Sequence, residues 1–169
     1  MDALTYRGTV RAWVLDGDPS TDEVAAAFAD PQHSMWGRVV DYTEHSNLVT
    51  NLGRQQMTKL IVAETTSVAS HIALSTTAIT PAAADTVATI TDRVSTVGLT
   101  IAQSYLSYYQ RYVAYFTTTS FGSTGVVAEA LLDAASTSAT TNLWADASIT
   151  VSKSTTQSLI VEHQILASS

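Results

Sequence analysis

NLVTNLGR, residues 47–54, is the most informative stretch of this 169-residue chain, because it joins two different patterns. Before it, residues 35–45 alternate between two faces with the two-residue period of a β-strand. After it, apolar residues recur on one side of a helix, and either Thr50 or Asn51 can cap that helix. We therefore predict a strand that leads directly into a short helix over residues 51–63.

The N-terminal part of the chain follows the same order of strand and helix. Residues 6–15 alternate as a half-buried strand does. Ser20 and Glu23 then have the spacing of a capping box, in which each side chain bonds the backbone N–H of the other residue. This spacing predicts a second short helix over residues 21–29.

Most of the remaining sequence predicts β structure. The expected strands, rich in β-branched and aromatic residues, cover residues 71–74, 86–96, 99–119, 126–133, 143–151 and 158–166. A helix is the alternative for residues 101–115, because Leu106, Gln110 and Ala114 have helical spacing. We predict a mainly β fold, an antiparallel β-sandwich with two short α-helices, as a single domain over residues 1–169.

The composition excludes several classes of function. Hydrophobic residues make up 46% and charged residues only 14%, so we expect neighbouring subunits to cover much of the surface. The net charge is −7 and no basic stripe is present, which disfavours nucleic acid as a partner. The absence of cysteine excludes disulfides and thiolate metal sites. We expect no signal peptide and no membrane segment, because no apolar run of suitable length occurs.

The sequence contains no pattern typical of an active site. None of the four histidines pairs with another at metal-ligand spacing, and we expect His71 and His163 to be hydrogen-bonded sheet residues. Glu129 is expected to make a buried or interfacial hydrogen bond rather than to act in acid–base chemistry. Residues 16–18 (Asp-Gly-Asp) form a turn in our interpretation, with a calcium ligand set as the alternative. We therefore predict no catalytic, cofactor-binding or metal-binding residue and no enzyme activity.

Two outward faces are candidates for contacts with another subunit. The run of residues 105–115 has apolar side chains on both faces, which predicts a strand covered on both sides. Tyrosine suits subunit interfaces because its ring is apolar and its hydroxyl can bond outward. A tyrosine platform for sugar binding is the alternative. The predicted interface residues, from this run and from the first strand, are Arg7, Arg11, Trp13, Tyr105, Tyr109 and Tyr115.

Several segments, in their order along the chain, resemble small structural proteins of tailed bacteriophages, usually described as tail or tail-fibre proteins. The similar segments are Gly8 to Asp16 (GTVRAWVLD), Asn47 to Arg54, His71 to Leu74 (HIAL), Pro81 to Thr86 (PAAADT), Glu129 to Ala134 (EALLDA) and the closing alternating strand. Two departures occur. Residues 75–77 read Ser-Thr-Thr where the family has Gly-Thr-Gly, and Leu131 stands where the family has glycine.

The resemblance implies a non-enzymatic virion structural protein, in first place a tail component of the fibre, tip or baseplate. Its partners would be copies of itself, in a homo-oligomer, and other virion structural proteins. It would be located in the virion after assembly in the host cytoplasm. A head decoration protein that stabilises the capsid is the alternative, and a receptor- or glycan-binding module is an alternative of another class.

Overall fold

The computed structural model describes residues 5–65, 68–86, 96–106, 109–120, 125–134 and 141–168, with residues 5, 96–106, 109, 167 and 168 described by their backbone alone. The described strands are β1 (Thr5–Asp16), β2 (Val39–Val49), β3 (His71–Ser75), β4 (Thr96–Leu106), β5 (Tyr109–Phe116), β6 (Gly125–Leu132), β7 (Leu143–Ser152) and β8 (Gln157–Ser168). Two α-helices, α1 (Thr21–Ala29) and α2 (Asn51–Ile61), and a 3₁₀ helix, η1 (Ser34–Arg38), accompany them. The prediction of a mainly β, antiparallel fold with two short helices is confirmed.

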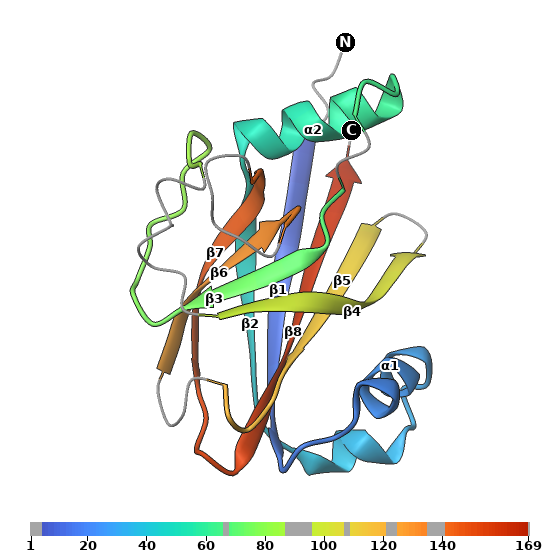
Figure 1. The fold of residues 1–169 in the computed structure, drawn as a ribbon, viewed down its shortest axis with the longest axis vertical. Coiled ribbons are helices and arrows are strands. Elements are labelled where there is room, and N and C mark those ends of the chain that lie inside the picture. Colours follow the sequence, from blue (N-terminus) through green and yellow to red (C-terminus); the bar gives the residue numbers. More distant parts are fainter. Residues whose placement is uncertain are drawn as a thin grey trace.

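The strands close into a barrel rather than forming the two separate sheets of the predicted sandwich. Their order is β1-β2-β7-β6-β3-β4-β5-β8, and β8 pairs again with β1. The seam between β2 and β7 is the narrowest, with two registered pairs, Leu48 with Asp146 and Val49 with Ala145. In a closed barrel, the strands that would be unpaired edge strands of a sandwich are hydrogen-bonded to a neighbouring strand on both sides. In Figure 1, β3 and β4 cross in front of the long strands β1 and β8, so they form opposite walls of the barrel.

Most of the interior of the barrel is apolar, and its composition follows from strand alternation. Val10, Ala12 and Val14 of β1 point inward, as do Leu159 and Val161 of β8. They meet Trp144, which is 1% exposed, and Phe116. The predicted division of residues 6–15 and 158–166 into two faces is therefore confirmed.

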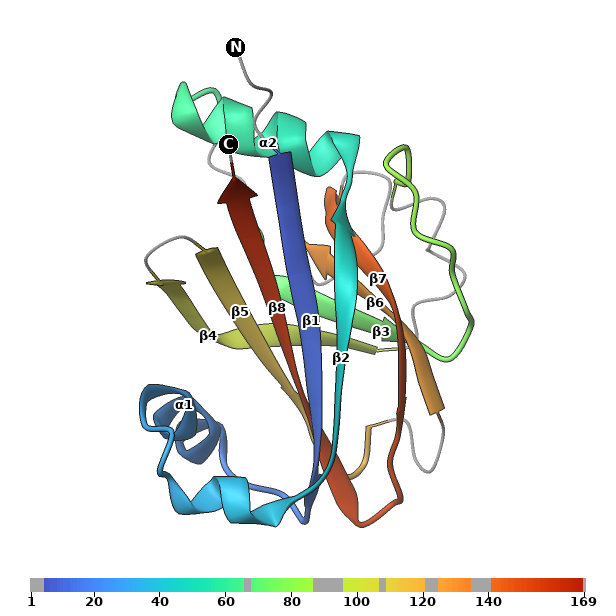
Figure 2. The same cartoon turned by 180° about the vertical axis from the view of Figure 1, so that it is seen from behind.

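Both helices begin where the sequence predicts. Ser20 Oγ accepts a hydrogen bond of 3.1 Å from the backbone N–H of Glu23 at the start of α1. Thr50 is the N-cap of α2, and its Oγ1 accepts a 2.9 Å bond from the backbone N–H of Gly53. Figure 2 shows α2 across one end of the barrel, near the chain termini, and α1 beside the other end.

Gly53 is needed for α2 to sit at this place. A Cβ added to it would lie 2.0 Å from the carbonyl oxygen of Trp144 in β7. The helix therefore touches the barrel backbone directly, which only glycine permits. Gly8 of β1 is in a similar position, because an added Cβ would lie 1.9 Å from the carbonyl oxygen of Gln164.

Two predicted elements were wrong in their extent. The strand expected from residue 35 begins only at Val39, because residues 34–38 form η1, which buries Met35 beneath α1. The strand expected over residues 99–119 is a pair of strands, β4 and β5, and neither is helical.

Both faces of β5 carry buried or half-buried apolar side chains, as predicted for a strand covered on both sides. Tyr112 and Phe116 point into the barrel, whereas Val113 and Tyr115 pack in the cluster beneath α1. The greater part of the strand predicted over residues 86–96 lies outside the described residues.

Candidate functional site

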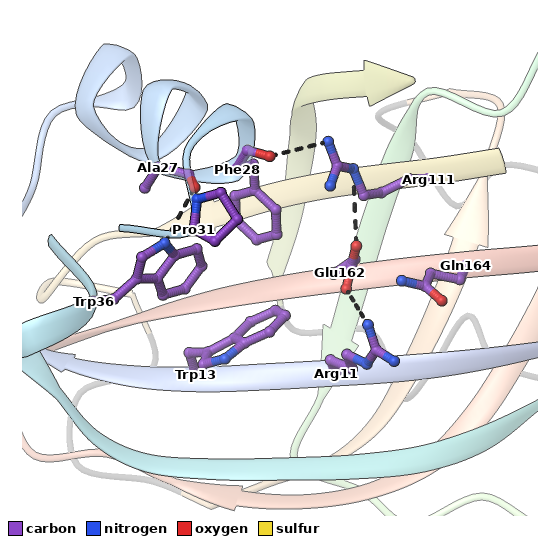
Figure 3. A pocket seen from close by; sticks show the side chains of 9 residues that line it. All are labelled: Arg11, Trp13, Ala27, Phe28, Pro31, Trp36, Arg111, Glu162 and Gln164. Carbon is purple, nitrogen blue, oxygen red and sulfur yellow. Dashed lines mark hydrogen bonds and ion pairs between the residues drawn. The ribbon is translucent and has the colours of Figure 1, made fainter. Parts of the chain in front are cut away.

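A groove of about 320 Å³ lies on the outside of the barrel, between α1–η1 and the strands β1, β5 and β8. One end is aromatic, with Trp13, Phe28 and Trp36 (Figure 3). The other end is polar, with Arg11, Arg111, Glu162 and Gln164. We call this hollow the outer groove.

Sheet register brings the polar residues of the outer groove together. Arg11 of β1 stands opposite Glu162 of β8, and Arg111 of β5 stands opposite Gln164. All four belong to the outward set of their strands, because alternate residues point to opposite faces. The polar end is therefore fixed by three long, paired strands rather than by loops.

The aromatic end is built by α1 and η1 folding back over β1. The ring centroids of Trp13 and Phe28 lie 5.5 Å apart, and those of Phe28 and Trp36 lie 5.2 Å apart, both near edge-to-face. The indole N–H of Trp36 donates a 3.1 Å hydrogen bond to the carbonyl oxygen of Ala27. All three rings remain half-buried, so parts of them face the groove.

Glu162 lies at the floor of the groove, with its side chain 3% exposed. Its carboxylate is 3.5 Å from Arg11 Nη1 and 3.8 Å from Arg111 Nε. Arg111 also lies over the ring of Phe28, at 5.3 Å from its centroid. Arg11 makes a shorter bond, 2.8 Å from Nε to the exposed carboxylate of Glu44.

Electrostatics at the margin of the groove favour the charged forms of Arg11 and Glu44. Partial burial alone would lower the pKa of Arg11, but the hydrogen bond to Glu44 and the nearby charge of Glu162 raise it overall. The hydroxyl of Tyr42 and the guanidinium of Arg11 lower the pKa of Glu44. The outer groove and its margin thus carry two guanidinium groups and two carboxylates, with no excess of either charge.

A second polar group lies inside the barrel and is closed to solvent. His163 Nδ1 is 2.8 Å from the carboxylate of Glu129, and both side chains are fully buried. Asn47 Nδ2 is 2.5 Å from His163 Nε2 and donates a 2.9 Å bond to the carbonyl oxygen of Gln164. An amide nitrogen can only donate, so Nε2 of His163 accepts and Nδ1 donates to Glu129. The expected hydrogen-bonding roles of His163 and Glu129 are confirmed.

Two acids, Asp85 in the segment after β3 and Asp146 of β7, lie near each other. Asp146 has no exposed surface, and neither of its carboxyl oxygens has a hydrogen-bond donor. Burial, and after it the adjacent carboxyl of Asp85, raise the pKa of Asp146 to about 8. Burial and the nearby carboxyl of Asp85 thus favour the protonated, neutral form of Asp146.

The acidic side chains of the turn at residues 16–18 accept hydrogen bonds from other parts of the chain. Gly17 has a φ of 74°, a conformation that favours glycine. The carboxylate of Asp18 accepts bonds of 2.6 Å from the Tyr115 hydroxyl and 2.8 Å from the backbone N–H of Thr118. In the described part of the chain, no group of three or more His, Cys, Asp or Glu residues could hold a metal ion.

The structure separates the six predicted interface residues. Arg11 and Trp13 both line the outer groove, although Trp13 is partly covered by the chain's own α1 and η1. Arg7 lines another hollow further along β1, and Tyr115 is half-buried with its hydroxyl bonded to Asp18. The side chains of Tyr105 and Tyr109 lie outside the described residues. Their burial by a second subunit stays a prediction.

Sequence reasoning did not identify the other residues of the outer groove, which are Ala27, Phe28, Pro31, Trp36, Arg111, Glu162 and Gln164. The outward position of Glu162 and Gln164 followed from the alternation of the last strand. Nothing in the sequence indicated that α1 would fold over this face.

Comparison of the chain with protein-family models, with curated proteins and with solved structures finds no match. No helix among the described residues is long and apolar enough to cross a membrane.

Proposed function

We propose that this chain is a non-enzymatic structural protein of a tailed-phage virion, in first place a tail component of the fibre, tip or baseplate. It acts through contacts with copies of itself and with other virion proteins, after assembly in the host cytoplasm. The observation that carries the proposal is the order of the resembling segments along the chain, from Gly8 to the last strand.

The resembling segments serve the architecture of the fold, which supports a structural role. Gly8 and Gly53 permit close backbone approaches. Asn47 ties β2 to β8 inside the barrel, and the backbone N–H of Asn51 donates a 2.7 Å bond to the carbonyl oxygen of Ala83. If this chain and the resembling phage proteins have the same fold, residues with such roles in the fold are the ones expected to be alike in both.

Exposed apolar side chains provide surfaces for subunit contacts. Val40 and Tyr42 on β2 are 50% and 47% exposed. At the C-terminal end of α2, Ile61 and Val62 are 77% and 58% exposed. Apolar surface of this kind is typical of the buried centre of an interface.

Mass spectrometry of purified particles from the phage that encodes this chain tests the proposal. We expect the chain in the particles, at a handful to a few dozen copies per particle for a tail location. Hundreds of copies would assign it to the head as a decoration protein. Absence from particles, with the chain present in the infected-cell lysate, would contradict the structural role.

A substitution at the end of α2 tests whether contacts are the means of action. Ile61→Glu should reduce incorporation into particles, because it places a charge on an exposed apolar surface. Gln55→Glu is the matched control, since Gln55 is exposed on the same helix and already polar. Equal incorporation of both variants and the unchanged chain would remove this end of α2 from the interface.

A further inference from the structure

The polar end of the outer groove keeps unused hydrogen-bonding capacity. No described residue bonds the side-chain amide of Gln164, which offers both a donor and an acceptor. The ion pairs of Glu162, at 3.5 and 3.8 Å, are long for charge-assisted hydrogen bonds, which are about 2.7–2.9 Å. A ligand at this end could therefore both donate to Glu162 and Gln164 and accept from Gln164.

The charges of the groove select against ionic ligands. Arg11 and Arg111 are balanced by Glu162 and Glu44. A phosphate would meet the buried carboxylate of Glu162, and a cation would meet the two guanidinium groups, so each gains an attraction and a repulsion together. A neutral ligand with several hydroxyl groups avoids both repulsions.

The aromatic end requires that the same ligand also present an apolar face. Trp13, Phe28 and Trp36 are half-buried and line the same groove as the polar residues, and Arg111 of the polar end lies 5.3 Å from the ring centroid of Phe28 (Figure 3). A purely apolar ligand would cover Glu162 and Gln164 without bonding them, which is costly. A sugar ring satisfies both ends, because its C–H face packs on aromatic rings and its hydroxyls both donate and accept.

We propose that the outer groove is a binding site for a neutral saccharide. The sugar ring lies against Trp13 and Trp36, and its hydroxyls bond Gln164 and Glu162. The volume of about 320 Å³ is at the small end of known ligand sites, which suits a short saccharide. This inference goes beyond the proposed structural function and does not depend on it.

Saturation-transfer NMR with the purified chain tests the site. The probes are glucose, galactose, mannose, N-acetylglucosamine and rhamnose as methyl glycosides, together with maltose and lactose. We expect at least one probe to receive saturation on its ring C–H protons. Gln164→Ala should weaken that binding by about tenfold, as expected for the loss of one well-made polar contact. Trp13→Ala should weaken it further.

Gln55→Ala is the matched control, because Gln55 is exposed on α2 at the other end of the barrel. It should bind like the unchanged chain. Gln164→Ala decides the question if Trp13→Ala fails to fold, since the side chain of Gln164 has no bond to lose in the described structure.

Three results would overturn the proposal. The first is that no saccharide probe binds at 10 mM, which is well above the dissociation constant of about 1 mM typical of a weak ligand. The second is that Gln164→Ala and Gln55→Ala bind alike. The third is that methyl phosphate or methylammonium displaces the saccharide by occupying the groove itself. If concentration-dependent self-association is lost in Gln164→Ala and no probe binds, the groove is a subunit contact. That result would support the proposed structural function while refuting the saccharide site.

Discussion

Glu162 and His163 are neighbours on β8, yet they belong to two different regions of the molecule. Glu162 points outward into the open groove, where two arginines approach it at 3.5 and 3.8 Å. His163 points inward and bonds Glu129 and Asn47 at 2.8 and 2.5 Å. The inner set of bonds is short, with His163 and Glu129 fully buried, whereas the outer set is long and borders an open groove.

The difference teaches how to separate structural from ligand-binding polar groups. Inside the barrel, Nδ1 and Nε2 of His163 each have a partner, and the side chains of His163 and Glu129 have no exposed surface. In the outer groove, Gln164 and Glu162 retain capacity next to solvent. A glutamate beside a histidine is not by itself a sign of catalysis; its access to solvent has to be considered first.

The largest expected loss of stability comes from a substitution inside the barrel. His163→Ala should destabilise the chain by roughly 3–5 kcal/mol, because it leaves the buried carboxylate of Glu129 without its partner. Urea denaturation measures this change. His45→Ala is the control, since His45 is only half-buried on β2 and should cost far less. Equal losses for the two variants would break the distinction between the inner and outer regions.

A second effect concerns Asp146, an acid covered by the segment after β3 rather than enclosed by the barrel. Its pKa rises from 3.8 to about 8 in the folded chain, because of burial and the neighbouring carboxyl of Asp85. The folded chain thus binds a proton that the unfolded chain has lost. The resulting stability is complete below pH 4 and is lost as the pH rises through 8, by at most about 1.4 kcal/mol per pH unit.

Asp146→Asn tests this dependence, because asparagine stays neutral and can donate to Asp85. The variant should be more stable than the unchanged chain at pH 8, by about 1 kcal/mol or more, and the gain should disappear toward pH 4. Urea denaturation at pH 5, 6.5 and 8 measures it. Asp41→Asn, at an exposed acid of β2, controls for the loss of net charge. A gain that is the same at all three pH values would show that Asp146 does not hold the extra proton.

The smallest effect belongs to the margin of the outer groove. Glu44→Gln removes the 2.8 Å pair with Arg11, whose two side chains are 35% and 45% exposed. Water and salt screen such a pair, so the loss should be below about 1 kcal/mol and should shrink further in 1 M salt. Urea denaturation at low and high salt measures it. A loss as large as that of His163→Ala would mean that the outer charges also hold the fold.

The sequence predicted local structure well where one physical cause acts over a few residues. The side-chain oxygens of Ser20 and Thr50 satisfy backbone N–H groups at helix starts, and both caps are visible in the sequence. It predicted less well where distant contacts decide. Residues 35–38 alternate like a strand but belong to η1, because burying Met35 beneath α1 outweighs the local pattern.

About half of the outer groove could be located on its strands by alternation alone, which places Arg11, Trp13, Glu162 and Gln164 on outward faces. Alternation says which way a side chain points, but it does not say which strands become neighbours. The pairing of β8 with both β1 and β5 sets Arg11 and Arg111 on either side of Glu162. The closing of the sheet into a barrel, and the folding of α1 over its outer face, were likewise decided by the tertiary structure. Barrel closure and the position of α1 depend on packing apolar surfaces that lie far apart in the sequence. The inward and outward faces of each strand and the helix caps depend only on residues a few positions apart.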